Sequence, residues 1–228
     1  MNLSVEVIAK STGSSLENAR KFEPYLNRYM RKYGINTPTR VMAFLSQIGV
    51  ESARLKAVEE YASGQAYEGR ADLGNIYQGD GQKFKGRGLI QITGRANYQG
   101  VQDHFGWDVI DNPEQLSDPN KATEVSAWWW SNRKRSGKYL NNWADELNPK
   151  DSIYSGNNAQ VYEQITRGVN GGVNGLAERK AFFEDSQSVY TQIYRQVQQW
   201  FTKWWGVGLI GILFGFGLVA VIKNIKKV

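Results

Sequence analysis

Hydrophobic residues recur at helical spacing through most of residues 1–199. A capping box formed by Ser14 and Glu17 predicts a helix that extends to about Lys32 and ends at Gly34. Later helical patterns occupy three more segments, which are 112–132, 161–168 and 176–194. The dominant predicted element is therefore the amphipathic helix.

A second helix is predicted to begin at Thr37 and Pro38, a pair typical of an N-cap followed by the first helical turn. Its apolar stripe consists of Val41, Phe44, Leu45, Ile48 and Leu55. Glu51 lies at the edge of that stripe, about 20° from Phe44 around the helix. Loss of water there raises the pKa of a carboxyl group, as a general acid requires. Spacing alone also allows an ordinary boundary glutamate that faces solvent.

Three more glutamates follow in the stretch 59–85, which is rich in Gly, Asp, Asn and Tyr and has no hydrophobic period. If the helix ends before this stretch and the chain folds back, Glu59, Glu60 or Glu68 faces Glu51 across a cleft. Two carboxylates about 6.5–9.5 Å apart, with room for water, fit an inverting glycosidase. Position alone does not choose among the three candidates.

Residues 89–93 alternate between apolar and polar side chains, which predicts a short strand. Gln91 and Thr93 share one face of that strand, and Asn97 lies just beyond it. A hydroxyl and two amides suit binding of water or of sugar hydroxyls, and capping of a turn is the alternative. Several helices with one small hairpin predict an α+β fold that is mostly α-helical.

Composition excludes several kinds of chemistry. The 228 residues include no cysteine and a single histidine, His104, so a disulfide scaffold, a thiol nucleophile and a multi-histidine metal site are excluded. The net charge is +6, but four lysines and no acidic residue after residue 199 account for four of these charges. We therefore expect no nucleic-acid partner.

Residues 206–222, GVGLIGILFGFGLVAVI, carry no charge, with tryptophans just before them and lysines just after. As a helix they span about 25 Å, slightly less than a hydrocarbon core of ~30 Å. We predict a single-pass transmembrane helix, preceded by an amphipathic helical stalk at 186–205 and followed by a basic tail at 223–228. A buried core helix is the alternative. Gly211 and Gly215 form a G-x-x-x-G pair, a candidate site of self-association.

Four blocks in fixed order resemble glycoside hydrolase family 19, and within it the bacteriophage endolysin branch that is related to chitinases. The blocks are 43–52 AFLSQIGVES, 67–75 YEGRADLGN, 79–98 GDGQKFKGRGLIQITGRANY and 165–179 ITRGVNGGVNGLAER. The resemblance implies a lysozyme-like domain over residues 1–185, mostly helical, with a cleft between two lobes. It also implies that no metal or organic cofactor is needed.

Carried over by position, the resemblance implies that Glu51 is the general acid and Glu60 the general base. Thr93 would help to hold the attacking water, and Arg179 would pair with carboxylates of the site. The candidate substrate-binding residues are Gln91, Asn97, Asn170, Arg179 and Glu68. At position 50 this chain has valine where the family usually has histidine.

These features together predict a membrane-anchored phage lytic enzyme that cleaves the β-1,4 glycan of bacterial peptidoglycan. Its partners would be the cell-wall glycan and a lipid bilayer, in a virion's internal membrane or in the host inner membrane facing the periplasm. The N-terminal sequence MNLSVEVIAK does not resemble a secretory signal. The alternatives are a chitinase, a lytic transglycosylase, or a catalytically inactive glycan-binding or virion scaffold protein, the last kept open by Val50.

Overall fold

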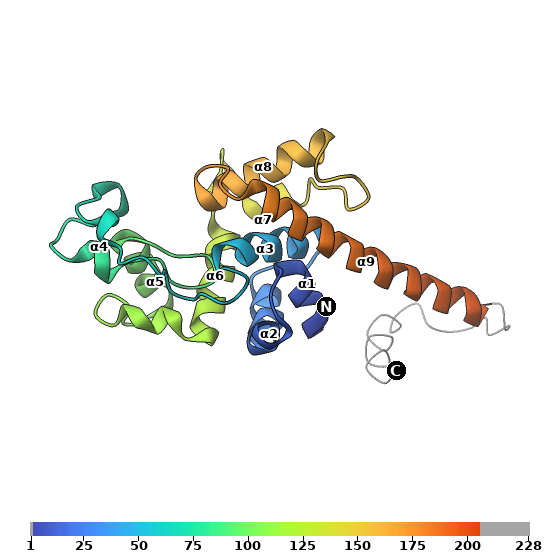
Figure 1. Cartoon of the computed structure of the whole chain (residues 1–228), viewed down its shortest axis with the longest axis horizontal. Coiled ribbons are helices and arrows are strands. Elements are labelled where there is room, and N and C mark those ends of the chain that lie inside the picture. Colours follow the sequence, from blue (N-terminus) through green and yellow to red (C-terminus); the bar gives the residue numbers. More distant parts are fainter. Residues whose placement is uncertain (1, 206–228) are drawn as a thin grey trace. The chain divides into compact units, whose positions relative to one another are not determined.

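The structure, a computed structural model, describes the backbone of residues 2–205 and the side chains of residues 2–192 (Figure 1). The fold is mostly helical, as the sequence predicts. The α-helices are α1 (Val5–Thr12), α2 (Leu16–Lys32), α3 (Pro38–Glu51), α4 (Asp80–Lys83), α5 (Arg95–Phe105), α6 (Pro119–Asn132), α7 (Leu140–Ala144), α8 (Gly156–Asn170) and α9 (Leu176–Trp205). Short 3-10 turns form η1 (Gln65–Tyr67), η2 (Ala71–Leu73) and η3 (Pro113–Ser117).

The chain divides into two compact units, Met1–Gln187 and Ser188–Val228. Helix α9 extends across residue 185, so the predicted boundary between the glycosidase domain and the stalk stays a prediction. Within residues 2–205, no helix combines the length and the apolar character that crossing a bilayer requires. The predicted membrane segment 206–222 lies outside the described residues, together with the basic tail.

Three helix starts follow from capping side chains. Thr37 and Asp118 each accept backbone N–H groups of the following turn and are the N-caps of α3 and α6, as their sequences indicate. The prediction that Ser14 caps α2 is wrong by one residue, because Ser15 is the N-cap. Ser14 still belongs to the end of α1, where its N–H donates to the carbonyl oxygen of Ala9 at 2.9 Å.

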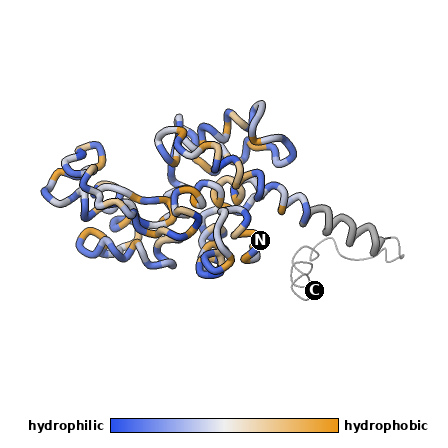
Figure 2. Tube along the Cα trace, in the orientation of Figure 1, coloured by the Kyte–Doolittle hydropathy of each residue, from blue (hydrophilic) through white to orange (hydrophobic). Residues whose placement is uncertain are grey.

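The apolar stripe of α3 forms part of the core. Val41, Phe44, Leu45 and Ile48 are at most 2% exposed, and Figure 2 shows hydrophobic and hydrophilic positions interspersed along the helices. Burial of such side chains contributes about 1.5–3 kcal/mol each. The core therefore fixes α3, and with it the position of the residue at its C-terminal end.

Helix α3 ends abruptly in a left-handed turn. Ala53, Arg54 and Leu55 have φ angles of 48°, 65° and 59°, a conformation that costs about 1–2 kcal/mol per non-glycine residue. Burial of Leu55, which is 1% exposed, offsets part of this cost, as does the hydrogen bond from the Arg54 N–H to the Gly49 carbonyl at 2.6 Å. The turn therefore follows directly on Glu51, the last residue of α3, and its C-cap Ser52.

The strand predicted at residues 89–93 is wrong. Residues 88–91 form a tight turn, closed by the Gln91 N–H, which donates to the Gly88 carbonyl at 3.2 Å. Gln91 has a φ of 58°, which no regular strand allows. Arg87 makes isolated bridges to Glu59 on one side and to Ile92 on the other. The glycines before the alternating residues therefore produce a turn, and the alternation has no long partner strand.

The small hairpin lies further along the chain. Strands β1 (Lys134–Arg135) and β2 (Lys138–Tyr139) pair in antiparallel register. Ser136 and Gly137 connect them with φ angles of 50° and 77°, the positive values that a two-residue hairpin turn requires.

Within the first unit, the elements fall into two groups. Helices α3, α7 and α8 pack on one another, whereas α4 packs on η1 and α5 on η2. In Figure 1, α4 and α5 lie on one side of α6, while α3, α7 and α8 lie on the other. The predicted site residues are divided between these groups, and a cleft between them stays a prediction.

Candidate active site

Glu51 is the last residue of α3 and is bound by an arginine from a distant part of the chain. Nη2 of Arg179, in the first turns of α9, donates to Oε1 of Glu51 at 2.6 Å. The Arg179 side chain is 1% exposed and that of Glu51 is 15% exposed. The structure therefore pairs Arg179 with Glu51, and the catalytic role of this carboxylate stays a prediction.

Arg179 is itself held from several sides. Its Nη1 donates to Oε1 of Gln47 at 2.6 Å, and its Nε donates to the carbonyl of Asn174 at 3.2 Å. Gln47 in turn donates to Thr166 Oγ1 on α8 at 3.0 Å. Sequence reasoning missed Gln47, which is fully buried. Its position four residues before Glu51, on the same face of α3, is the signal that the sequence offered.

Asn170, the last residue of α8, carries a buried polar atom without a partner. Its Oδ1 is shielded from solvent and accepts no hydrogen bond within the part of the chain that the structure describes. Buried polar atoms are nearly always paired in folded proteins, so an unpaired acceptor points to a missing donor. A sugar hydroxyl, an acetamido N–H or a water molecule can supply it.

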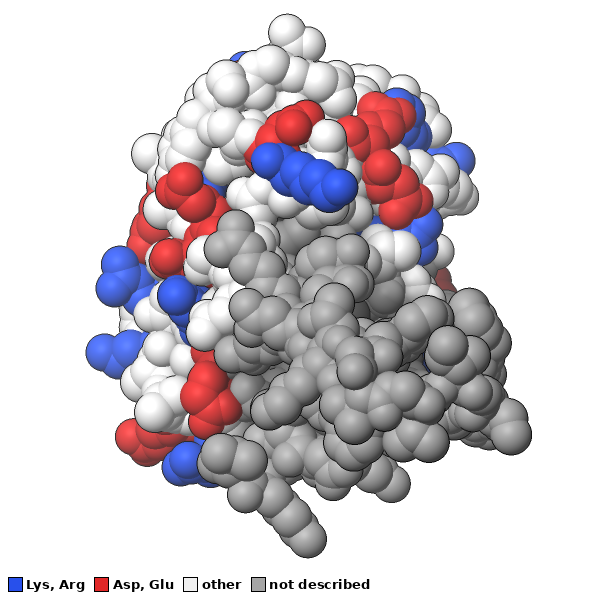
Figure 3. Space-filling view, turned by 90° about the vertical axis from the view of Figure 1, so that its right-hand side faces the viewer, with Lys and Arg blue, Asp and Glu red and all other residues white. Residues whose placement is uncertain are grey.

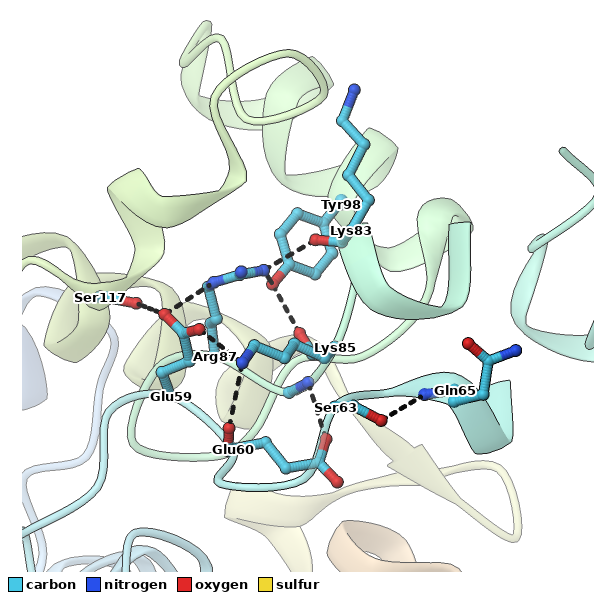
Figure 4. A network of polar contacts seen from close by, with 10 residues as sticks. Glu59, Glu60, Ser63, Gln65, Lys83, Lys85, Arg87, Tyr98 and Ser117 are labelled. Carbon is cyan, nitrogen blue, oxygen red and sulfur yellow. Dashed lines mark hydrogen bonds and ion pairs between the residues drawn. The ribbon is translucent and has the colours of Figure 1, made fainter. Parts of the chain in front are cut away.

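Glu59 is tied into an ionic cluster (Figure 4). Its carboxylate binds Lys85 Nζ at 2.7 Å and Arg87 Nε at 3.3 Å, and it accepts a hydrogen bond from Ser117 at 3.1 Å. Burial raises the pKa of Glu59, but these hydrogen bonds and the charges of Lys85 and Arg87 outweigh it, so the pKa lies below its ordinary value. Glu59 is therefore a poor proton acceptor.

Glu60, the next residue, has different surroundings. Its Oε1 accepts a hydrogen bond from the Tyr67 hydroxyl at 3.0 Å, and its Oε2 accepts one from the Gly86 N–H at 3.1 Å. Its backbone N–H donates to the Gly86 carbonyl at 2.9 Å, and Lys85 donates to its backbone oxygen at 3.3 Å. Within the described residues no cation pairs with this carboxylate, so geometry favours Glu60 over Glu59 as a base.

Hydrogen bonds connect Gln91 to Thr93 and Thr93 to Asn97, and Gln91 and Glu60 both lie next to Gly86. A Cβ built on Gly86 would lie 2.6 Å from Gln91 Oε1 and 3.2 Å from Glu60 Oε2, so both oxygens flank this glycine. Thr93 Oγ1 donates to the Gln91 carbonyl at 3.0 Å, and Asn97 Nδ2 donates to the Thr93 carbonyl at 2.7 Å. These bonds are the turn-capping contacts that the sequence allowed, and contact with sugar stays a prediction.

Glu68 fixes a loop. Its two oxygens accept the backbone N–H groups of Gly79 at 2.7 Å and Gly81 at 2.8 Å. Nearby Asp80, 1% exposed, accepts two hydrogen bonds from Arg95, at 2.9 and 2.6 Å, and two from backbone N–H groups. Glu68 therefore has a clear structural role, and its predicted role in substrate binding stays a prediction.

The candidate residues Glu51 and Glu60 are suited to acid–base chemistry. Glu51 ends a helix beside a guanidinium, and Glu60 lies in a loop beside a phenol and a backbone amide. Two carboxylates in different surroundings are suited to different proton-transfer roles. Within the described residues, no group of three or more His, Asp and Glu side chains is placed to hold a metal ion.

Charge on the surface is mixed. On the face shown in Figure 3, acidic and basic side chains are interspersed among uncharged ones. Exposed ion pairs in the described part of the chain include that of Arg54 with Glu178 at 3.0 Å. The visible described surface therefore presents no block of a single sign.

Comparison with known families and sequences gives consistent matches. The family described as chitinase class I matches residues 38–199. A glycosyl hydrolase family 19 domain-containing protein of Haemophilus influenzae is 31% identical over 121 residues, which are 53% of this chain and 49% of that protein. The acidic 27 kDa endochitinase of Solanum lycopersicum is 28% identical over 95 residues, 41% of this chain and 38% of that protein. The chain spans about half or less of the length of these relatives.

Solved structures show the same fold. Chitinase C from Streptomyces griseus superposes with a TM-score of 0.57 at 17% identity, covering 82% of this chain and 91% of that one. A bacterial family 19 chitinase superposes with a TM-score of 0.56 at 19% identity, covering 82% and 95%. At these identities the likeness concerns the fold, and it agrees with the mostly helical arrangement described above.

Proposed function

The chain belongs to the chitinase class I family, glycoside hydrolase family 19, and from that premise we propose that it hydrolyses the β-1,4-linked glycan of bacterial peptidoglycan. The observation that supports this most directly is the contrast between two half-buried carboxylates. Glu51 is paired with buried Arg179, whereas Glu60 is bound by neutral donors. The two carboxylates therefore have distinct surroundings, as an acid/base pair requires, and the roles of Glu51 as acid and Glu60 as base are carried over from the family.

The proposed reaction inverts the anomeric centre. Protonated Glu51 donates its proton to the glycosidic oxygen as the bond from that oxygen to the anomeric carbon breaks. Glu60 takes a proton from water, whose oxygen forms the new bond to the same carbon. Both carboxyl groups then return to their starting states by proton exchange with solvent. Arg179 stabilises the Glu51 carboxylate after it has lost its proton.

Substrate positioning falls to neutral side chains. Gln91 lies near the proposed base at Gly86, and Thr93 bonds to the Gln91 carbonyl; both side chains are suited to hold the attacking water. The buried Oδ1 of Asn170 is suited to accept a hydrogen bond from an N-acetyl group or a hydroxyl of the sugar. Asn97 extends the polar surface next to Thr93.

The cellular setting is proposed from the sequence. Residues 206–222 would anchor the enzyme in a bilayer, with Gly211 and Gly215 as a packing face for a second helix. A phage enzyme carried in a virion's internal membrane, or held in the host inner membrane, would open the wall locally during entry or lysis. Immunoblotting of purified virions tests the first setting, and absence of the protein from them overturns it.

Mass spectrometry of the products tests the reaction. The full chain is incubated with purified peptidoglycan beside Glu51→Gln, Glu60→Gln and the control Glu114→Gln, which changes an exposed glutamate. We expect reducing disaccharide-peptides from the wild type and the control, and none from the two site variants. Unchanged products from Glu51→Gln would contradict its role as the acid.

Two rival activities give different products. The endochitinase names of several relatives favour a chitinase, for which hydrolysis of chitin oligomers without peptidoglycan products would be decisive. A lytic transglycosylase needs a single acid/base carboxyl and leaves anhydro ends, which would persist in Glu60→Gln. A wild type without activity on either polymer would favour an inactive glycan-binding or scaffold protein.

A further inference from the structure

A groove of about 340 Å³ opens between the β1–β2 turn, α7 and α8. Its lining includes one aromatic ring, Trp143, and three side-chain amides, of Asn157, Gln160 and Gln164. A volume of this size accommodates a small ligand, and sites of this kind combine an aromatic surface with a few polar groups.

The groove is separate from the candidate active site. Gln160 precedes Asn170 by ten residues on α8, which is about 15 Å along the helix axis. Gln164 and Thr166 are two residues apart, so they are turned about 200° from one another around the helix. Thr166 contacts Gln47 beneath the Glu51–Arg179 pair. The groove therefore lies on the opposite face of α8 from the candidate active site.

The aromatic wall of the groove is held in place. The indole N–H of Trp143 donates to the Arg135 carbonyl at 3.0 Å, and the Lys138 ammonium lies 3.8 Å from the centre of the ring. Ser136, in the tight turn between β1 and β2, brings a hydroxyl to the rim. A ring fixed in this way is preorganised for contact with a ligand, which lowers the entropic cost of binding.

The groove is close to electrically neutral. Its charged lining residue, Glu146, is paired with Lys138. The amides supply the remaining polarity. The side chain of Gln160 has no hydrogen-bond partner in the described part of the chain, Gln164 accepts a hydrogen bond from Arg135 Nε at 3.4 Å, and Asn157 Nδ2 donates to the Glu146 carbonyl at 3.3 Å, which leaves its oxygen for a ligand. Amides both donate and accept hydrogen bonds, so they suit hydroxyls and acetamido groups rather than phosphates or carboxylates.

We propose that this groove is a second glycan-binding site that takes an N-acetylhexosamine unit of the polymer. The apolar face of the sugar would lie against Trp143, and its hydroxyl and acetamido groups would bond to Asn157, Gln160 and Gln164. The inference rests on the proposed function, because its ligand is the polymer cleaved there. Binding at two points of one polymer raises the effective concentration of cleavable bonds at the catalytic residues without changing the chemical step.

Kinetics on two substrates test the proposal in the full chain. The variant is Asn157→Ala/Gln160→Ala, and the matched control is Asn142→Ala/Gln99→Ala; all four side chains are exposed. On insoluble peptidoglycan we expect the half-saturating concentration to rise about fivefold or more in the variant, as for one or two lost hydrogen bonds. On a soluble glycan tetrasaccharide, whose few units are taken up at the catalytic residues, we expect no change. Equal values for variant and control on both substrates would overturn the proposal.

Direct binding separates this inference from the proposed reaction. Glu51→Gln, in the full chain, is sedimented with glycan strands stripped of their peptides, with and without Asn157→Ala/Gln160→Ala. Weaker binding of the groove variant supports the site even if the wild type proves inactive as a hydrolase. Loss of binding to intact peptidoglycan alone, with stripped strands bound normally, would assign the groove to the stem peptide and overturn the glycan assignment.

Discussion

Arg179 and Glu51 form an ion pair of 2.6 Å in which the guanidinium is almost completely buried. The two residues are 128 positions apart, so the pair joins the end of α3 to the start of α9. A buried arginine cannot shed its charge, and it depends on its partners for compensation. The same contact therefore supports the fold and holds the proposed acid.

Arg179→Ala should destabilise the protein by about 3–5 kcal/mol, because it leaves the Glu51 carboxylate and Gln47 without their donor. Urea unfolding measures the loss. The double variant Arg179→Ala/Glu51→Gln should lose less free energy of unfolding than the sum of the two single variants, because each single change already removes the same ion pair. Arg54→Ala, which breaks an exposed pair with Glu178, should cost at most about 1 kcal/mol. A similar loss of free energy of unfolding in Arg179→Ala and Arg54→Ala would contradict the argument that burial makes the Arg179 pair the more important for stability.

Glu59→Gln should lower activity indirectly. The change weakens the bonds to Lys85 and Arg87 that position the segment carrying Glu60, and we expect activity to fall about tenfold, equivalent to 1.4 kcal/mol. Glu60→Gln should cost about 10²–10⁴-fold, because it removes the base itself. Initial rates on peptidoglycan decide between them. A larger loss of activity in Glu59→Gln than in Glu60→Gln would indicate that Glu59 is the base and that Glu60 acts indirectly.

Local signals in the sequence predict much of the helical frame. Thr37 and Asp118 act within their own first turns, so a reader of the sequence sees both the cap and the capped residues. The alternation at residues 89–93 misleads because Gly88, with a φ of 79°, begins a tight turn whose carbonyl accepts hydrogen bonds from the backbone and the side chain of Gln91. Periodicity carries no information on such closure.

The choice of base could not be made from the sequence. Glu59 and Glu60 are adjacent and chemically alike, and they differ because Lys85 and Arg87 fold back onto one of them. That selection involves residues more than 25 positions away, and the family resemblance supplies it only by analogy. The pairing of buried Arg179 with Glu51 likewise joins residues 128 positions apart, and the family resemblance supplies it only by analogy.

Asp80 should make the protein sensitive to acid. Hydrogen bonds from Arg95, together with backbone N–H groups and the charge of Arg95, hold the pKa of Asp80 below its ordinary value of 3.8 despite burial. Its contribution to stability is therefore complete above that value and is lost as the pH falls below it towards the folded-state pKa. Urea unfolding at pH 7 and pH 3 should show Asp80→Asn clearly less stable than wild type at pH 7, with a smaller difference at pH 3. Asp111→Asn, at a side chain that is 80% exposed, should leave the pH dependence unchanged.

Gly86→Ala should reduce activity more than stability. The added methyl group would meet Gln91 Oε1 at 2.6 Å and Glu60 Oε2 at 3.2 Å, and both are ends of flexible side chains that can move aside. Moving them displaces the proposed base and a proposed ligand for water, so we expect activity to fall at least about tenfold while the free energy of unfolding changes by about 1 kcal/mol or less. Gly100→Ala, in α5 with open space around it, should instead stabilise the protein by about 0.5–1 kcal/mol and leave activity unchanged. Full activity in Gly86→Ala would show that neither oxygen needs its present position for catalysis.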